Sequence, residues 1–125
     1  MEFIHLNVHS HYSKGWGICS IEALCLSSKR MGMDTLALTD TNGIYGLMFF
    51  LEAARDAGIK PIVGSEVVSD GGHRALLLIR NRTGYAGLCR ILSDRNCHRE
   101  FDLIKSIAEK RDGLIIISDD FSLLK

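Results

Sequence analysis

The sequence predicts an α/β fold in which mostly parallel strands are covered by helices. Segments with the pattern of a strand alternate along the 125 residues with segments of helical period. The connections between them are short, and most of the expected strands are continuous apolar runs, as in parallel strands that helices cover. In such folds the working site lies at the carboxyl ends of the strands.

The predicted elements begin with a strand and then largely alternate. Strands are expected at 3–9, 35–40, 60–68, 71–81 and 113–118, and helices at 20–32, 43–58, 83–92 and 99–111, with a further helix starting at 119. Ser20 is a typical N-cap, and Gly32 and Gly58 are typical residues for ending a helix. The strand at 60–68 begins beside the only proline, where a missing amide matters least.

The first strand carries a polar face. Residues 3–9 alternate strictly, so that the side chains of His5, Asn7 and His9 point away from the apolar ones. His9 stands at the end of this strand, and Asp40 and Glu66 stand at or near the ends of the next two. Since the carboxyl ends of parallel strands meet at one rim, these three side chains are expected to converge there.

Composition narrows the class of protein. Apolar residues make up 46% of the chain and charged residues 24%, as in a globular domain with a real core. Basic and acidic residues number 15 each, and this balance argues against independent binding to nucleic acid. The four cysteines form no closely spaced pairs, and no signal peptide or membrane-length apolar run is present. We therefore expect a cytoplasmic protein with reduced thiols and no membrane segment.

Four stretches in register resemble a known family. They are FIHLNVHSHYS, MGMDTLALTDTNGIYGL, AARDAGIKPIVGSEV and RNRTGYAGLCRILS, and the likeness runs from Phe3 to about Ser118. Together they are similar to the polymerase and histidinol phosphatase (PHP) domain, in the form found at the amino terminus of bacterial polymerase III alpha subunits and their error-prone relatives. The resemblance implies the amino-terminal part of a distorted (β/α)7 barrel. Intact members hold up to three divalent metals at the strand ends and hydrolyse phosphoesters.

The resemblance also sets expectations for organisation and partners. Residues 1–125 correspond to the first half to two-thirds of such a domain, because the later strands, with a further histidine and an Asp-x-His pair, are absent. The implied partner is the rest of a polymerase chain, or a second copy through self-association. Contact with nucleic acid is expected only through a larger assembly, and none with a membrane.

The metal-binding motifs of the family are partly altered. The first motif, His-x-His, is here Asn7-Val8-His9, and the second, Thr-Asp-His, is Thr39-Asp40-Thr41. An aspartate that polymerase relatives often carry aligns with Trp16. The glutamate of the third motif is kept as Glu66, and His73 aligns with a histidine near the fourth strand. The implied ligands of a weakly held Zn, Mn or Mg ion are therefore His9, Glu66, Asp40, Asn7 and His73.

Several of these residues have simpler explanations. His9 could be a hydrogen-bonded histidine at a strand end, and His73 a turn residue. Asp40 could cap a helix that begins near Gly43, where aspartate is preferred. Glu66 is harder to explain structurally, since a buried carboxylate needs a partner.

Two functions fit this ligand set. The first is a PHP segment of a replication or repair polymerase, with a degenerate metal site and a mainly structural role. In that case the chain alone does not hydrolyse phosphoesters, because two of its ligands are replaced and the late ones are missing. The alternative is a small metal-dependent phosphoesterase that self-association completes.

Overall fold

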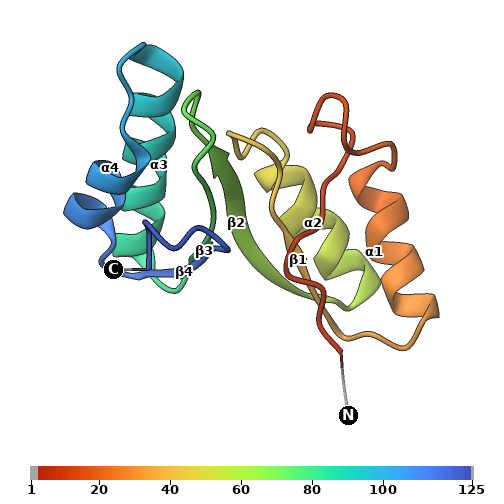
Figure 1. The fold of residues 1–125 in the computed structure, drawn as a ribbon. Helices are drawn as coiled ribbons and strands as arrows, with labels where there is room; N and C mark the ends of the chain where they lie inside the picture. Colours follow the sequence, from red (N-terminus) through yellow and green to blue (C-terminus); the bar gives the residue numbers. More distant parts are fainter. Residues whose placement is uncertain (1–2, 125) are drawn as a thin grey trace.

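The computed structural model describes residues 3–124 and contains one four-stranded sheet with four helices (Figure 1). The elements are α1 (Ile21–Arg30), β1 (Thr35–Leu38), α2 (Leu47–Ala57), β2 (Lys60–Val68), β3 (Arg74–Ile79), α3 (Arg82–Cys97), α4 (Leu103–Lys110) and β4 (Leu114–Ile117). The predicted α/β class is confirmed. None of the described helices is long and apolar enough to cross a membrane.

One strand runs against the other three. The sheet order is β1-β2-β3-β4, and the β1–β2 pair is parallel whereas the β2–β3 and β3–β4 pairs are antiparallel. β1, β2 and β4 therefore share a direction, as expected, and β3 is reversed. The reason is the connection between β2 and β3, a tight turn in which Ser69 N–H donates to His73 O at 2.9 Å. Such a turn can join only antiparallel strands.

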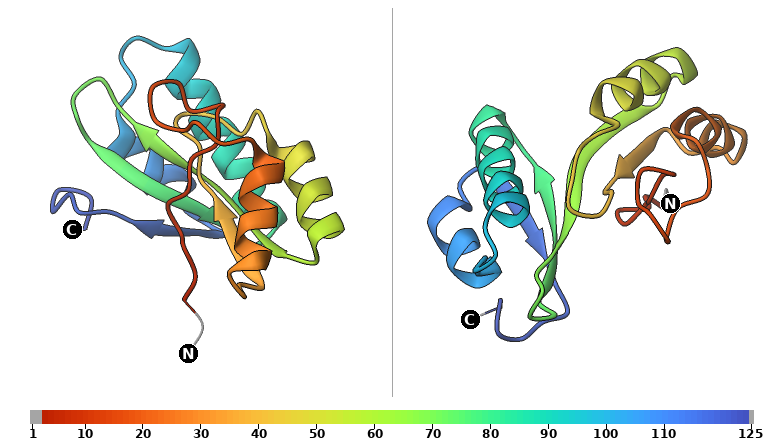
Figure 2. Two further views of the ribbon diagram at one scale, coloured as in Figure 1. Left: turned by 90° about the vertical axis from the view of Figure 1, so that its right-hand side faces the viewer. Right: turned by 90° about the horizontal axis from the view of Figure 1, so that it is seen from above.

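β2 joins the two halves of the molecule. Its first part pairs with β1 and its second part with β3, so it passes between the two groups of helices (Figure 2). Gly64 lies where the pairing changes from one neighbour to the other. A Cβ at this position would lie 2.4 Å from the carbonyl oxygen of Leu77, so the close approach of the two strands requires glycine.

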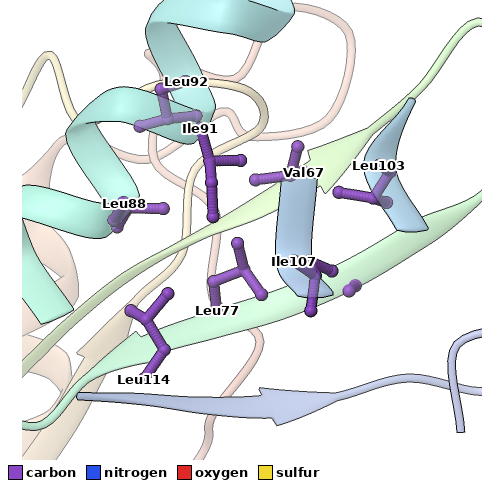
Figure 3. Close-up of a cluster of buried hydrophobic side chains, with 9 residues drawn as sticks. Val67, Leu77, Leu88, Ile91, Leu92, Leu103, Ile107 and Leu114 are labelled. Atoms are coloured by element: carbon purple, nitrogen blue, oxygen red, sulfur yellow. The ribbon is translucent and has the colours of Figure 1, made fainter. Parts of the chain in front are cut away.

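Both groups of helices pack on the same face of the sheet. Val63 packs against the cluster under α1 and α2, and Val67 belongs to the cluster under α3 and α4. Side chains two or four residues apart on a strand share a face. The second cluster consists of Val67, Ala75, Leu77, Leu88, Ile91, Leu92, Leu103, Ile107 and Leu114 (Figure 3). Gly64 and Glu66 lie on the opposite face, which we call the inner face.

The ends of the helices agree only partly with the prediction. Ser20 caps α1 by accepting a hydrogen bond from Ala23 N–H at 3.1 Å, and Gly58 ends α2 in the left-handed conformation. α2 begins at Leu47, however, with Gly46 as its N-cap, and not near Gly43. The idea that Asp40 caps this helix is therefore wrong.

The two ends of the described chain also differ from the prediction. Residues 3–9 are extended but form no regular strand. They run beside β1, and Thr39 N–H donates to Val8 O at 2.8 Å, but Val8 N–H donates to the side-chain oxygen of Thr39 at 3.0 Å. A side chain thus replaces a backbone partner and interrupts the ladder. Residues 119–124 form a turn and not the start of a helix.

Two side-chain contacts hold this last turn against the start of β3. Arg74 donates to Asp119 at 2.8 Å, and His73 is hydrogen-bonded to Asp120. The hydrogen bond and the charge of Arg74 lower the pKa of Asp119 below its ordinary value. The pKa of Asp120 is lowered in the same way, first by its hydrogen bond to His73 and then by one from the backbone of Ser122.

These lowered pKa values predict an acid-sensitive contact. An acid whose pKa falls on folding stabilises the fold above its unfolded pKa, about 3.9 for aspartate, and loses that contribution as the pH drops through the folded value. We expect the carboxyl ¹³C resonance of Asp120 to titrate with a midpoint below about 3.9, and His73→Ala to raise this midpoint. An unchanged midpoint in His73→Ala would show that the contact does not form in solution.

Candidate metal centre

Asn7, His9 and Glu66 come together on the inner face of the sheet. The Nε2 atom of His9 lies 2.9 Å from Oδ1 of Asn7 and 4.0 Å from Oε1 of Glu66. Asn7 in turn donates from Nδ2 to Oε2 of Glu66 at 3.3 Å. Two of these residues lie two positions apart on the first extended segment, as the alternating pattern predicted. The structure therefore brings together three of the five residues named from the sequence.

Glu66 takes its place through the register of two strands. Beyond the end of β1 the pairing with β2 continues in the same register, because Glu66 N–H donates to Asp40 O at 3.1 Å and Asn42 N–H donates to Glu66 O at 2.9 Å. Thr41 is thus directly opposite Glu66, and residues opposite each other share a face. Thr41 Oγ1 lies 3.3 Å from Nδ1 of His9.

Asp40 faces the other way, since neighbouring residues of an extended chain point to opposite sides. It is 2% exposed. Its oxygens accept hydrogen bonds from Ser10 N–H at 2.7 Å, from Ser10 Oγ–H at 2.8 Å and from Ser13 Oγ–H at 2.7 Å. Asp40 is therefore linked to His9 only through Ser13, whose Oγ lies 2.8 Å from Nδ1 of His9.

His73 is also occupied elsewhere. It lies at the turn between β2 and β3, where its ring contacts Asp120. The side chain that borders Glu66 from the start of β3 is Arg74. A cavity of about 180 Å³ next to the site is lined by Asn7, Glu66, Arg74, Ala75, Leu76, Ile117, Ser118 and Asp119. Asp119, and more weakly Glu66, holds the pKa of Arg74 above its ordinary value.

Trp16 covers part of the site. Its ring is stacked on that of His9, with centroids 6.1 Å apart and an angle of 28° between the planes. It is the only tryptophan of the chain and is 69% exposed. Trp16 therefore supplies no ligand oxygen, although polymerase relatives often have an aspartate at this position. Its fluorescence can report the binding of an ion at His9.

The donor set around Glu66 offers ligands for at most one divalent ion. Glu66 is 9% exposed, and His9 is the only described side chain within 4.0 Å that can give its carboxylate a positive partner. A buried carboxylate needs either several hydrogen-bond donors, as Asp40 has, or a partner of opposite charge. Among the described groups, only Asn7 Nδ2 donates to the carboxylate of Glu66, so a protonated imidazole or a bound cation would supply what is missing. Among residues 3–124, however, no three His, Cys, Asp or Glu side chains are grouped as they would be around a metal. An imidazole, a carboxylate and an amide oxygen remain, which are too few ligands for a metal cluster.

Three residues around the site were not found from the sequence. Ser10 and Ser13 hold Asp40 and His9, and Arg74 lines the cavity. Serine is common in loops, so no pattern distinguishes these two. Arg74 reaches the site because β3 pairs with β2 in the antiparallel direction, which places Arg74 opposite Val68 and Leu76 opposite Glu66. The apolar run of β3 does not indicate this direction.

Comparisons with known proteins relate the chain to one family of domains. Residues 5–123 match the PHP domain family. The chain is 38% identical over 100 residues to an error-prone DNA polymerase of Symbiobacterium thermophilum. This alignment covers 80% of this chain and 9% of that protein. It is 35% identical over 129 residues to the DNA polymerase III subunit alpha of Buchnera aphidicola, and 34% identical over 128 residues to that of Escherichia coli. These two alignments cover 94% and 98% of this chain and 11% of each subunit.

Two solved structures share the fold. A Bifidobacterium adolescentis protein classed as a metal-dependent phosphoesterase superposes with a TM-score of 0.54 at 17% identity, covering 85% of this chain and 37% of that one. An amidohydrolase from Chromobacterium violaceum gives a TM-score of 0.53 at 24% identity, covering 98% and 46%. At these identities the likeness concerns the fold alone.

Proposed function

The chain belongs to the PHP domain family, and from this premise we propose that it serves as the PHP segment of a bacterial polymerase III alpha-type protein. It is homologous to a part of such subunits, and it spans about a tenth of the length of the curated relatives it matches. On this proposal, the chain takes part in DNA replication or repair in the cytoplasm. It contacts the rest of a polymerase chain. DNA would be reached only through that larger assembly, in keeping with the equal numbers of acidic and basic residues.

We further propose that residues 1–125 correspond to the first part of a PHP barrel. Two features support this. The two structural neighbours are covered by 37% and 46% of their lengths. In addition, the described residues leave part of the inner face uncovered: Ile115, on this face of β4, is 46% exposed, and Ile117 is 40% exposed. Apolar side chains on the inner face of a barrel are normally covered by the strands opposite.

The metal site is proposed to hold one divalent ion weakly. His9 would bind it through Nε2, Glu66 through its carboxylate and Asn7 through its amide oxygen. When bound, Zn, Mn or Mg supplies a Lewis acid and lowers the pKa of its water. Glu66 provides the negative charge, and Arg74 places a guanidinium at the adjoining cavity. The single observation that carries this proposal is the convergence of His9 Nε2 and the carboxylate of Glu66, 4.0 Å apart.

The proposed role is mainly structural, because the family's hydrolytic centre needs several metals. Asn7 and Thr41 replace two imidazoles of the family motifs with an amide and a hydroxyl. An amide oxygen is a weak and neutral ligand, better suited to calcium than to zinc. With two strong ligands, the site lacks what is needed to keep two or three ions close together.

The experiment is a titration of the chain with Mn²⁺, followed through the fluorescence of Trp16. A paramagnetic ion held at His9 would quench the ring that stacks on it. We expect saturable quenching in the parent, and affinity at least about tenfold lower in His9→Ala and Glu66→Ala, equivalent to about 1.4 kcal/mol of binding free energy.

The matched control is His98→Ala, because this histidine is 69% exposed and makes no contact with the site. It should leave the quenching curve unchanged. The proposed metal site is contradicted if His98→Ala lowers the affinity for Mn²⁺ as much as His9→Ala does. It is also contradicted if the quenching in the parent does not saturate. Circular dichroism spectra of all variants must match that of the parent for the comparison to count.

The alternative function, a phosphoesterase completed by self-association, is favoured only by the open inner face. It requires that a dimer forms and that the dimer with metal hydrolyses a phosphodiester. Sedimentation velocity and a bis(p-nitrophenyl) phosphate assay on the titrated samples separate the two. A monomer without turnover supports the structural role, and a dimer whose turnover depends on His9 supports the phosphoesterase.

A further inference from the structure

We propose that Asp40 and Ser13 are positioning residues that fix the tautomer of His9. In this arrangement the neutral ring carries its proton on Nδ1 and presents the lone pair of Nε2 to Asn7 and Glu66. Asp40 thereby acts through Ser13 and does not itself bind the ion. The consequence for metal affinity rests on the proposed function, whereas the position of the proton can be observed without any metal.

The first step concerns the proton of Ser13. Asp40 is 2% exposed, and Ser10 and Ser13 are 0% and 1% exposed. The carboxylate accepts from Ser10 N–H and from both serine hydroxyls at 2.7–2.8 Å. A carboxylate with this set of donors is an acceptor only, and no water is needed to satisfy it. The single hydroxyl proton of Ser13 is therefore given to Asp40.

The second step concerns the remaining bonds of Ser13. Its oxygen accepts a hydrogen bond from Thr41 N–H at 2.9 Å, which leaves it one further lone pair. Nδ1 of His9 lies 2.8 Å away. Since the hydroxyl proton is already committed, Ser13 can only accept from this nitrogen. Nδ1 must then carry a hydrogen, and in the neutral ring Nε2 carries none.

The third step concerns what Nε2 faces. It lies 2.9 Å from Asn7 Oδ1, so two acceptors meet. Turning the amide of Asn7 around gives no relief, because its oxygen would then meet the carboxylate of Glu66, 3.3 Å from the present nitrogen. Three groups with lone pairs thus surround one point that lacks a positive charge. A metal-binding histidine commonly donates its other N–H to a carboxylate or carbonyl, and here a serine relays that contact to Asp40.

The test uses protein with ¹⁵N in the imidazole rings and two-dimensional ¹H–¹⁵N spectra at about pH 8.5, where an ordinary histidine is neutral. In the parent without metal, we expect His9 to show the Nδ1–H pattern. In Ser13→Ala it should change to Nε2–H, the form that imidazole in water prefers and that can donate to Asn7. Ser13→Thr, which keeps the hydroxyl, should restore Nδ1–H, and His98 should be the same in every spectrum.

A second variant covers the case in which Ser13→Ala fails to fold. Asp40→Ala removes the oxygen that accepts the hydroxyl proton of Ser13, which frees this proton for His9. It should therefore also shift His9 toward Nε2–H. The inference is overturned if the parent shows Nε2–H, or if His9 keeps Nδ1–H in a folded Ser13→Ala or Asp40→Ala.

Metal affinity gives an independent readout. Loss of an outer contact to a metal-binding histidine costs about 10–100-fold in affinity. We expect Ser13→Ala to weaken Mn²⁺ binding by this amount and Ser13→Thr to stay within about threefold of the parent. A parent with Nδ1–H that binds no Mn²⁺ contradicts the proposed metal but supports the tautomer. A parent that binds Mn²⁺ through His9 with Nε2–H in the free protein contradicts the tautomer and leaves the metal site standing.

Discussion

Changing both Asn7 and Thr41 to histidine is expected to raise the affinity for Zn²⁺ by at least about hundredfold. Both side chains already lie beside His9 on the inner face, and Thr41 is directly opposite Glu66. The double variant would replace a weak amide ligand and a hydroxyl with two imidazoles, which suit zinc well. About tenfold for each imidazole corresponds to about 1.4 kcal/mol of binding free energy each.

The affinity can be measured by competition with a chromogenic chelator for Zn²⁺. Each single variant, Asn7→His or Thr41→His, should give an intermediate value. The control is Thr83→His, which makes the same change as the second substitution at an exposed position on α3. An affinity no higher in the double variant than in Thr83→His would mean that positions 7 and 41 do not surround a common ion.

Shortening Leu77 to alanine is expected to lower the free energy of unfolding by about 2–5 kcal/mol. Leu77 lies on β3, is fully buried, and belongs to the cluster between the sheet and α3 and α4 (Figure 3). The loss combines the transfer free energy of the removed atoms with the cavity that they leave, because the strands and helices around them cannot fully collapse. Urea unfolding followed by circular dichroism measures it.

Leu26→Ala is the matched control, because Leu26 lies on α1 and is 52% exposed. This change should alter the free energy of unfolding by no more than about 0.5 kcal/mol. If both substitutions cost the same, the cluster around Leu77 is not packed in solution as it is in the structure. Two-state unfolding, with similar denaturant slopes in the three proteins, is the condition for the comparison.

The elements that were predicted well are those fixed by local patterns. β2 spans the residues 60–68 that were predicted for it, Ser20 caps α1, and Gly58 ends α2. The direction of β3 could not be obtained in this way, because an apolar run looks the same in either direction. The first extended segment was predicted as a strand from its alternation alone. It fails to become regular because the hydroxyl of Thr39 takes a backbone partner, which only the tertiary structure reveals.

The placement of the polar side chains was predicted in part. Alternation correctly placed Asn7 and His9 on one face, and strand order brought them to Glu66. Asp40 was expected to converge with them but points away from Glu66, because the register of the two strands, which only the tertiary structure reveals, places Thr41 opposite Glu66. The serines that hold Asp40 were beyond prediction, because their role depends on a loop packed against the end of a strand.

The two borders of the sheet leave different possibilities for attaching further polypeptide. At one border, the irregular segment 3–9 lies along β1 and disturbs its hydrogen-bonding groups. At the other, no described strand pairs with the outer side of β4, whose sequence LIII contains no charge. An uncharged and regular outermost strand is the place where a further strand adds most easily. A further strand should therefore pair with β4. This holds both for more of the same polypeptide and for fibril-like aggregation at high concentration.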